Sequence, residues 1–351
     1  MNSPTKKRVA VLTSGGDSPG MNATIYGFVA SAINAGLEPY IVVDGYDGLI
    51  DNHIFPISYN KARQHAHDAG TFIGSARSMR YKNDPTMRQL AKKNLEKNKI
   101  SGLLVIGGDG SYQGAQLLHE LKFPVLAAPG TVDNDVGSSI VTVGFNSAAQ
   151  VIFDCLKTIK KTAISHRSVF LIEAMGRHCV DLSVIAGIAG IADAIITAEN
   201  PFNTQDFIEY VKKAEARGQR GVIFLVTEKV YGKEYSDQLD DLNVIAKAIE
   251  KATDRTTRYQ VIGYLQRGAT PTATDVLLGI GFGNQAIQLF LENKVGYALG
   301  SNGWDYYETE LAIANQLKPA DRTKMMEWNN KLININETKP VITATDNPTK
   351  K

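Results

Sequence analysis

Short runs of apolar, β-branched residues recur along the chain, and each ends in glycine or a polar cluster before a helical pattern begins. In the first half these runs are RVAVLT before Gly15, EPYIVVD before Gly45, GLLVIGGDGS before a helix from about Tyr112, and FPVLAAPGTVDND. Strands that alternate with helices predict a parallel sheet with helices on both faces. Continuous apolar runs are typical of strands buried on two faces. The pattern therefore predicts an α/β fold.

The second half repeats this pattern with SVFLIEAMGR, GVIFLVTEKVYG and RYQVIGYLQRG, which predicts a second α/β layer system. The longest apolar stretch, VIAGIAGIADAIITA from Val184, contains Asp193 and is shorter than the ~20 residues that span a bilayer. We interpret it as a buried helix followed by a strand. The last stretch, NETKPVITATDNPTKK, is polar with little periodicity, and a frayed tail is expected there.

Composition narrows the class of protein. A chain of 351 residues, 43% hydrophobic and 21% charged, is typical of a globular protein of about two domains. The formal net charge is +2 without a long basic run, so the charge pattern of a nucleic-acid-binding protein is absent. Two cysteines, Cys155 and Cys179, cannot form a disulfide framework and suit a reducing compartment. The apolar run at the N-terminus is too short for a signal-peptide core, so we expect a cytoplasmic location.

Three loops of the first half are candidates for one site, because ligands bind beyond the carboxyl ends of the strands in an open parallel sheet. The first loop, in VLTSGGDSPGMN, lacks side chains at Gly15, Gly16 and Gly20, so its backbone N–H groups can approach an anion. It has neither the G-x-G-x-x-G spacing of dinucleotide folds nor the Gly-Lys-Ser/Thr of a P-loop, so it is not specific by itself. The second loop, GGDGS at 107–111, adds a carboxylate. The third, PGTVDND, follows a buried strand.

Aspartates in these loops are candidates for chemistry. Asp109 is the kind of hard oxygen ligand that Mg²⁺ takes together with phosphate oxygens, and a local Asp-Gly turn is the alternative. Asp133 and Asp135 lie two residues apart; one suits a general base, and the other an orienting group or a water-mediated metal partner. The alternative for this pair is an Asx turn and helix cap around Asn134.

Cationic and sugar-binding candidates come from later segments. Guanidinium groups match phosphate oxygens bidentately, although any one arginine could equally be a solvated surface residue. The arginines in suitable loops are Arg77, Arg177, Arg258 and Arg267. Glu228, which ends VIFLVTE, could accept a sugar hydroxyl or could cap the strand.

Taken in order, TSGGDSPGMN, GGDGS, PGTVDND, EAMGR and LQRG resemble the motifs of the ATP-dependent 6-phosphofructokinase family, from about Val9 to about Lys318. The resemblance implies two doubly wound α/β domains with mostly parallel sheets and the active site in the cleft between them. It implies a nucleotide-binding domain at 1–144 plus about 266–316, and a sugar-phosphate domain at 145–265 plus about 317–331. Residues 332–351 would be a polar tail. It also implies a homotetramer with substrate sites shared between subunits.

The activity implied by the resemblance is phosphoryl transfer from MgATP to the 1-hydroxyl of fructose 6-phosphate in glycolysis, with Mg²⁺ as cofactor and ATP as co-substrate. Asp133 would be the general base, with Thr131 and Asp135 beside the transferring group, Asp109 at the metal, and Arg177 stabilising the moving phosphoryl group. The nucleotide would contact Gly15, Gly16, Tyr46, Arg77, Ser78, Gly108, Asp109, Gly110 and Ser111. The sugar phosphate would contact Thr131, Asp133, Met175, Gly176, Arg177, Glu228, Tyr264 and Arg267, with Arg258 reaching across from a neighbouring subunit.

Other functions are weighed against this one. Pyrophosphate-dependent members of the family carry Asp where Gly110 stands and Lys where Gly130 stands, so two glycines favour ATP. A catalytically weak, nucleotide-binding regulatory relative stays open. A nicotinamide-dependent oxidoreductase is disfavoured, because Asp44 ends the second strand but the glycine spacing fails. Neither a nucleic-acid nor a membrane partner is expected.

The chain departs from the family pattern at positions that usually bind anions. Ser168 stands where an arginine usually reaches the 6-phosphate of a neighbouring subunit's substrate, and Tyr264 replaces a histidine. Arg167, one step earlier, would point to the opposite face of a strand. Losing one charged hydrogen bond costs about 1.5–3 kcal/mol, so we expect weaker binding of the 6-phosphate. Control by ADP or phosphoenolpyruvate should also be blunted, because cations usual at the regulatory site are replaced by Tyr26, Ala30 and Gln219.

Overall fold

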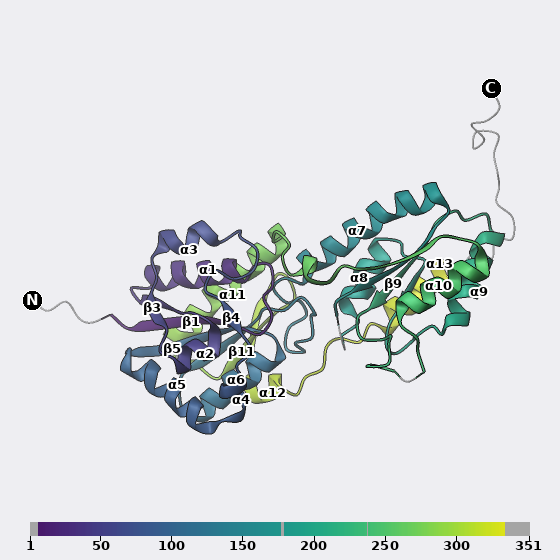
Figure 1. Ribbon diagram of the computed structural model, residues 1–351. Helices are drawn as coiled ribbons and strands as arrows, with labels where there is room; N and C mark the ends of the chain where they lie inside the picture. The colour runs from purple at the N-terminus through teal and green to yellow at the C-terminus, as the bar shows by residue number, and fades with distance from the viewer. Residues whose placement is uncertain (1–5, 177–178, 237, 334–351) are drawn as a thin grey trace, which may run out of the picture. The chain divides into compact units, whose positions relative to one another are not determined.

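The computed structural model describes residues 6–176, 179–236 and 238–333, the last three of them by their backbone only. Nearly all of the predicted tail at 332–351 therefore lies outside the described residues. The chain divides into two compact units, Met1–Ala149 with Tyr264–Ala320, and Gln150–Gly263 with Asp321–Lys351. Each unit is a sheet between layers of helices (Figure 1). The predicted α/β fold is confirmed.

The first unit contains an eight-stranded sheet in the order β12-β11-β6-β5-β1-β2-β3, with β4 paired to the end of β1. Its strands are β1 (Arg8–Ser14), β2 (Glu38–Val42), β3 (Ile54–Pro56), β4 (Ser75–Ala76), β5 (Ile100–Gly107), β6 (Val125–Pro129), β11 (Tyr297–Ser301) and β12 (Tyr306–Glu310). The neighbours from β2 to β11 run parallel, and the edge strands β3 and β12 are antiparallel. Strand β6 is buried throughout, as its continuous apolar sequence predicts.

Helices cover both faces of this sheet (Figure 1). One face carries α1 (Met21–Asn34), α3 (Tyr59–His65) and α11 (Ala273–Leu291), and the other carries α2 (Gly45–Ile50), α4 (Met79–Asn83), α5 (Pro85–Lys97) and α6 (Asp109–Glu120). Helix α12 (Leu311–Ala314) follows β12. Successive side chains of β1 alternate between two cores: Val11 packs with Phe28 and Phe282, whereas Leu12 packs with Leu49 and Tyr112.

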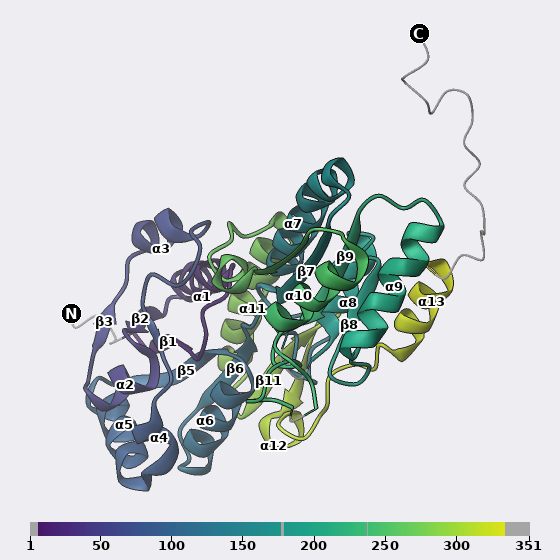
Figure 2. The same ribbon diagram turned by 45° about the vertical axis from the view of Figure 1, so that its right-hand side comes forward.

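The second unit is built on a four-stranded parallel sheet in the order β10-β7-β9-β8 (Figure 2). Its strands are β7 (Val169–Ala174), β8 (Ala194–Ile196), β9 (Val222–Thr227) and β10 (Thr257–Val261). Its helices are α7 (Phe145–His166), which begins in the first unit, α8 (Asp181–Ala189), α9 (Thr204–Ala216), α10 (Leu242–Thr253) and α13 (Thr323–Ile333). The stretch from Val184 forms the end of α8 and then β8, as predicted. Among the described residues, no helix combines the length and apolar character that a membrane crossing requires.

A buried carboxylate joins the starts of two helices in the first unit. Asp275, in the first turn of α11, has no exposed surface and accepts hydrogen bonds from Ser147 N at 2.7 Å and Ser147 Oγ at 2.5 Å. Asn146 Nδ2 donates to its other oxygen at 3.3 Å. Burial raises the pKa of Asp275 and the bonds from Ser147 oppose this shift, so the side chain links the start of α7 to α11.

We expect Asp275→Ala to lower the free energy of unfolding by about 2–3 kcal/mol, because the buried donors of Ser147 lose their acceptor. Asp84 is a matched control, since its exposed carboxylate also accepts one backbone N–H and one hydroxyl, both from Thr86. Asp84→Ala should cost about 1 kcal/mol, the usual value for an N-cap. Urea denaturation measures both losses, and equal losses would contradict this account.

Candidate active site

The order of strands in the first sheet positions the candidate loops. Strand β1 lies between β2 and β5, so the chain first builds one side of the sheet and then crosses to the other. Such a reversal leaves a crevice beyond the carboxyl ends of the strands on either side of it, where ligands bind in this class of fold. The loops that leave β1, β5 and β6 all start at this end, at residues 15, 108 and 130.

Hydrogen bonds join the three loops to one another. Ser111 Oγ, after β5, donates to Ser14 O at the end of β1 at 3.0 Å. Gly130 N, after β6, donates to Gly107 O at the end of β5 at 3.0 Å. Tyr46 supports Ser111 from within the core, because its hydroxyl donates to Ser111 O at 2.8 Å. The backbone carbonyl groups at the ends of β1 and β5 therefore accept hydrogen bonds from the neighbouring loops.

A second set of bonds ties the third loop back to the first. Val143 O accepts from Ser18 Oγ at 2.8 Å and from Thr131 N at 3.1 Å. Thr142 Oγ1 donates to Thr131 O at 2.7 Å. Together with the bonds above, these contacts close a ring through all three loops, so the structure brings the sequence-predicted loop residues of the first unit together.

Asp133 and Asp135 lie in the third loop of this ring. Asp133 is 5% exposed, and its N–H donates to Thr131 Oγ1 at 3.2 Å. Asn134 has a left-handed backbone, φ 54°, and its Oδ1 accepts from Thr142 N at 2.9 Å. Asn134 thus stabilises the turn that carries Asp133 and Asp135, as the alternative of an Asx turn predicts. This structural role is compatible with a chemical role for the two aspartates.

The three aspartates of the loops affect one another electrostatically. Burial raises the pKa of Asp135, and the charges of Asp133 and Asp109 raise it further, against a bond from Thr131. No donor among the described residues contacts Asp135 Oδ1, which is shielded from solvent. A carboxylate in this setting favours a nearby cation.

Asp109 is exposed and begins α6, three residues earlier than the predicted start near Tyr112. Gly108 precedes the helix as its N-cap, and a carboxylate in the first turn is favourable beside the free N–H groups there. Gln113 Nε2 donates to Asp109 Oδ2 at 2.9 Å. Among the described residues no three acidic, histidine or cysteine side chains converge into a metal site. Mg²⁺ commonly takes one or two carboxylates plus phosphate oxygens, which these aspartates suit.

The other predicted nucleotide contacts occupy different environments. The Tyr46 ring is 3% exposed and stacked on Tyr81 with ring centroids 4.2 Å apart. Tyr46 is therefore a core residue, and its hydroxyl group donates a hydrogen bond to Ser111 O. Ser78 caps α4 by accepting from the N–H of Tyr81 at 3.1 Å. Arg77 is exposed.

In the second unit, Met175, Gly176 and Glu228 lie beyond the carboxyl ends of neighbouring strands. Glu228 N donates to Ala174 O at 2.7 Å, which holds the two strand ends together. Beside them is Glu173, a residue that the sequence reasoning missed. Burial raises the pKa of Glu173 and the charge of Glu228 raises it further, while a 3.1 Å hydrogen bond from the Tyr259 hydroxyl opposes both. Arg177 lies outside the described residues.

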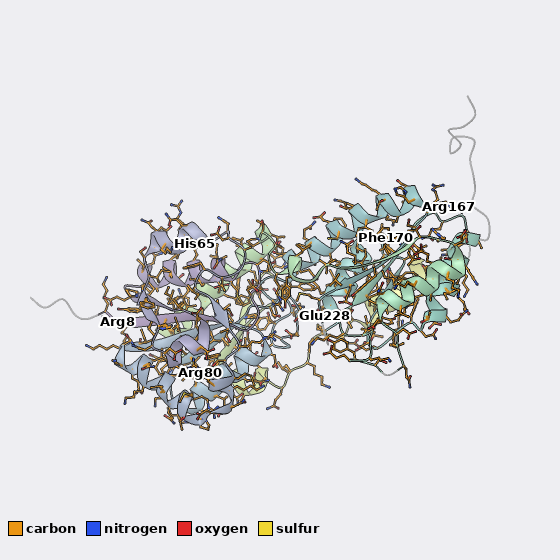
Figure 3. The ribbon with its side chains drawn as sticks, in the orientation of Figure 1. Arg8, His65, Arg80, Arg167, Phe170 and Glu228 are labelled. Atoms are coloured by element: carbon orange, nitrogen blue, oxygen red, sulfur yellow. The ribbon has the colours of Figure 1, made fainter. Side chains whose placement is uncertain are left out.

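Arg258 and Ser168 lie at the other end of the same sheet. Arg258 pairs in register with Phe170, the second residue of β7, and its Nη1 lies 3.4 Å from Glu250 Oε2. Figure 3 shows Arg167 and Glu228 at opposite ends of this unit, with Phe170 between them. Arg167 is exposed and is paired with a glutamate of α9 at 3.4 Å. Ser168 is only 4% exposed.

The remaining two sugar-phosphate candidates belong to the first unit and differ sharply in exposure. Tyr264 is 81% exposed. Arg267 is 7% exposed, and its Nη1 donates to Asp17 O in the first glycine loop at 2.9 Å. Nothing in the sequence signals this contact, because the two residues are 250 positions apart.

Gln219, the regulatory candidate of the second unit, lines a hollow of about 470 Å³ together with Lys160. Gln219 Nε2 donates to Asp193 Oδ1 at 2.6 Å, and Lys160 Nζ donates to Ile191 O at 3.2 Å. Both side chains are thus bonded within the unit. Blunted control by anionic effectors stays a prediction.

The family model described as Phosphofructokinase matches residues 8–290. The chain belongs to the phosphofructokinase family. A relative from Haemophilus influenzae (strain PittEE), named ATP-dependent 6-phosphofructokinase, is 41% identical over 295 residues, which are 84% of this chain and 89% of the relative. One of the same name from Vibrio cholerae serotype O1 is 40% identical over 315 residues, 89% of this chain and 95% of the relative.

Solved structures of phosphofructokinases share the fold. The phosphofructokinase of Saccharomyces cerevisiae superposes with a TM-score of 0.82 at 28% identity, over 93% of this chain; this chain spans half the length of the yeast chain. A pyrophosphate-dependent phosphofructokinase from Marinobacter aquaeolei gives a TM-score of 0.80 at 21% identity, over 96% of this chain and 94% of that one. The second likeness shows the phosphofructokinase fold alone.

The raised pKa of Asp135 has a consequence for stability. A carboxylate whose folded-state pKa is raised destabilises the fold once it ionises, so stability falls as pH rises through that pKa. We expect Asp135→Asn to raise the thermal midpoint at pH 7 by about 2–4 °C, with a smaller gain near pH 4. Asp109→Asn, at an exposed position, should change the midpoint less. Calorimetry at both pH values measures these shifts, and a lower midpoint for Asp135→Asn at pH 7 would refute the argument.

Proposed function

We propose that this chain transfers the γ-phosphoryl group of ATP to the 1-hydroxyl of fructose 6-phosphate, giving fructose 1,6-bisphosphate and ADP. The observation that carries the proposal is the buried Asp133 beside the ring that joins the three loops. The names of its relatives support the same activity. The first unit would bind the nucleotide and the second the sugar phosphate, as a homotetramer with shared sites.

Phosphoryl transfer asks little covalent chemistry of a protein and depends on in-line positioning and fixed charge. Asp133 takes the proton of the 1-hydroxyl, and its burial keeps the carboxylate away from bulk water. Thr131 and Asp135 lie beside the transferring group in this proposal. The backbone N–H groups of the loops after β1 and β5 face the phosphates, and Arg177 stabilises the charge of the moving group.

Asp109, with Asp135 close enough to feel its charge, would hold Mg²⁺ together with the nucleotide phosphates. When bound, the cation would neutralise part of the negative charge of the phosphates. The charges of Asp133 and Asp109 raise the pKa of Asp135 beyond the effect of burial.

The residues proposed to contact the sugar phosphate lie at both ends of the second sheet. Met175, Gly176 and Glu228 lie at the carboxyl ends of its strands, whereas Arg258 lies about 16 Å further down at 3.3 Å per residue. An Arg258 that contacts sugar phosphate would therefore serve a site other than the one at its own Glu228. Two copies of the chain that exchange Arg258 satisfy this geometry.

ATP is favoured over pyrophosphate by two glycines of the first unit. An added Cβ at Gly110 would meet nothing within 4 Å, so this position leaves open space beside the loop after β5. At Gly130 an added Cβ would lie 2.8 Å from Ile106 Cγ2 and 3.1 Å from Met21 Cε, so a lysine there would require these side chains to shift. We infer that the open space at Gly110 receives the nucleotide beyond its β-phosphate.

The Gly110→Asp variant separates nucleotide binding from folding. An aspartate at the second position of α6 suits the helix start, so the thermal midpoint should stay equal or rise. Activity with ATP should fall at least about tenfold, because the carboxylate occupies the space of a phosphate and repels it. A coupled assay with ATP or pyrophosphate measures both donors, with Asp133→Ser as the inactive control and Gly110→Ala as the steric control. Unchanged use of ATP by the Gly110→Asp variant would contradict the proposal. If the unaltered protein had no activity with either donor, a regulatory relative would be favoured.

Weaker binding of the 6-phosphate can be tested at Tyr264. Because this side chain is 81% exposed, Tyr264→His restores the usual imidazole without disturbing a core. We expect the KM for fructose 6-phosphate to fall several-fold at pH 6.5, near the pKa of an unperturbed histidine, with the KM for ATP unchanged. Ser168→Arg tests the same idea at a buried position and needs a parallel unfolding measurement. No gain from either variant would count against it.

A further inference from the structure

The chain returns to the second unit at Asp321, and the next residue forms a largely buried ion pair there. Arg322 donates to both oxygens of the Asp181 carboxylate, from Nε to Oδ1 at 2.9 Å and from Nη2 to Oδ2 at 2.6 Å. The Asp181 side chain is 1% exposed and the Arg322 side chain 19%. A guanidinium that donates two bonds to one carboxylate fixes the direction of both groups as well as their distance. The start of α13 is therefore attached to the first turn of α8.

Helix α8 is bonded to the two strand ends that carry sugar-phosphate candidates. Just before the helix, Cys179 N donates to Gly176 O at 2.8 Å, across the connection between β7 and α8. Within its first turn, Ser183 Oγ accepts a hydrogen bond of 2.9 Å from Thr227 Oγ1, and both residues are buried. Thr227 ends β9 and directly precedes Glu228. The position of α8 therefore affects both Gly176 and Glu228.

Close packing at Gly176 makes this connection sensitive to a shift of α8. Its φ is 135°, a backbone angle that favours glycine, and an added Cβ would lie 2.9 Å from Cys179 O. The same Cβ would lie 3.5 Å from Thr227 Cγ2 and 3.8 Å from Leu182 Cβ. The backbone at Gly176 is thus packed against the start of α8 and the end of β9. In a close-packed interior, a displacement of α8 is transmitted to it.

We propose that Arg322 is a positioning residue for the sugar-phosphate site, because through Asp181 it holds the first turn of α8 and with it the backbone at Gly176. The inference deepens the proposed function and rests on it for its kinetic part. No sequence motif indicates the pair, since its members are 141 positions apart. Loss of the guanidinium should loosen the start of α8 and weaken the binding of fructose 6-phosphate. Binding of the nucleotide, which the proposal assigns to the first unit, should not change.

Arg322→Met, alone and combined with Asp181→Asn, tests the inference. In the single variant the backbone amides at 179–184 should exchange faster in the ligand-free protein, because Asp181 loses two charged hydrogen bonds. The KM for fructose 6-phosphate should rise about tenfold, with the KM for ATP unchanged. The double variant removes both charges, so its thermal midpoint should recover part of the loss while its KM for fructose 6-phosphate stays raised. Arg322→Lys should restore part of the affinity, because an ammonium group can still donate to Asp181.

Lys157→Met is a matched control, because Lys157 also forms an ion pair in the second unit, with its Nζ 3.3 Å from Asp154 Oδ1, but on the exposed surface of α7. This variant should leave exchange at 179–184 and both KM values unchanged. A KM for fructose 6-phosphate that recovers together with the thermal midpoint in the double variant would indicate a structural role alone and overturn the inference. Unchanged exchange at 179–184 in Arg322→Met would overturn it as well. The exchange measurement needs no catalysis, so it decides whether Arg322 holds the start of α8 even if the proposed activity fails.

Discussion

The first unit depends on the ring of hydrogen bonds that joins the loops after β1, β5 and β6. Parallel strands end with backbone groups that have no further strand partner, and buried groups of this kind need one. Here the partners come from the neighbouring loops, through Ser111, Gly130 and Ser18. The same bonds that complete the sheet therefore set the shape of the candidate site, and neither can change alone.

This arrangement brings like charges together. The ring holds Asp133 buried and Asp135 partly buried, with Asp109 close enough to raise the pKa of Asp135. Burial and the neighbouring charges disfavour the ionised form of Asp135, so other contacts of the unit must offset that cost. Asp275, which accepts hydrogen bonds from Ser147 just after the third loop, is a further buried carboxylate whose pKa is raised by burial. In the proposed function, the same crowding of carboxylates that lowers stability would favour a bound cation.

The sequence indicates the buried strands well, because β1, β5, β6, β7 and β9 are apolar runs. The apolar stretch from Val184 is likewise confirmed as a helix followed by a strand. The loops could be placed at one end of the sheet because parallel strands share a direction. What could not be predicted are contacts set by tertiary packing. Tyr46, which the resemblance places beside the nucleotide, is buried against Tyr81. The guanidinium of Arg267 lies next to Gly16, which is 251 positions away along the chain. The Tyr259 bond to Glu173 likewise exists only because β10 pairs with β7 in that register.

Strand direction also limits which residues of the second unit can act together. In an all-parallel sheet, the side chains at the carboxyl ends form one group and those at the amino ends form another. Glu228 and Glu173 belong to the first group, and Arg258 and Ser168 to the second. No change of rotamer in an arginine spans that separation, so the acidic and basic ends of one sheet cannot bind the same sugar phosphate. In the proposed oligomer with shared sites, a neighbouring copy would bring its basic end to the acidic end of the first. The replacement at Ser168 would then weaken the partner's site rather than its own.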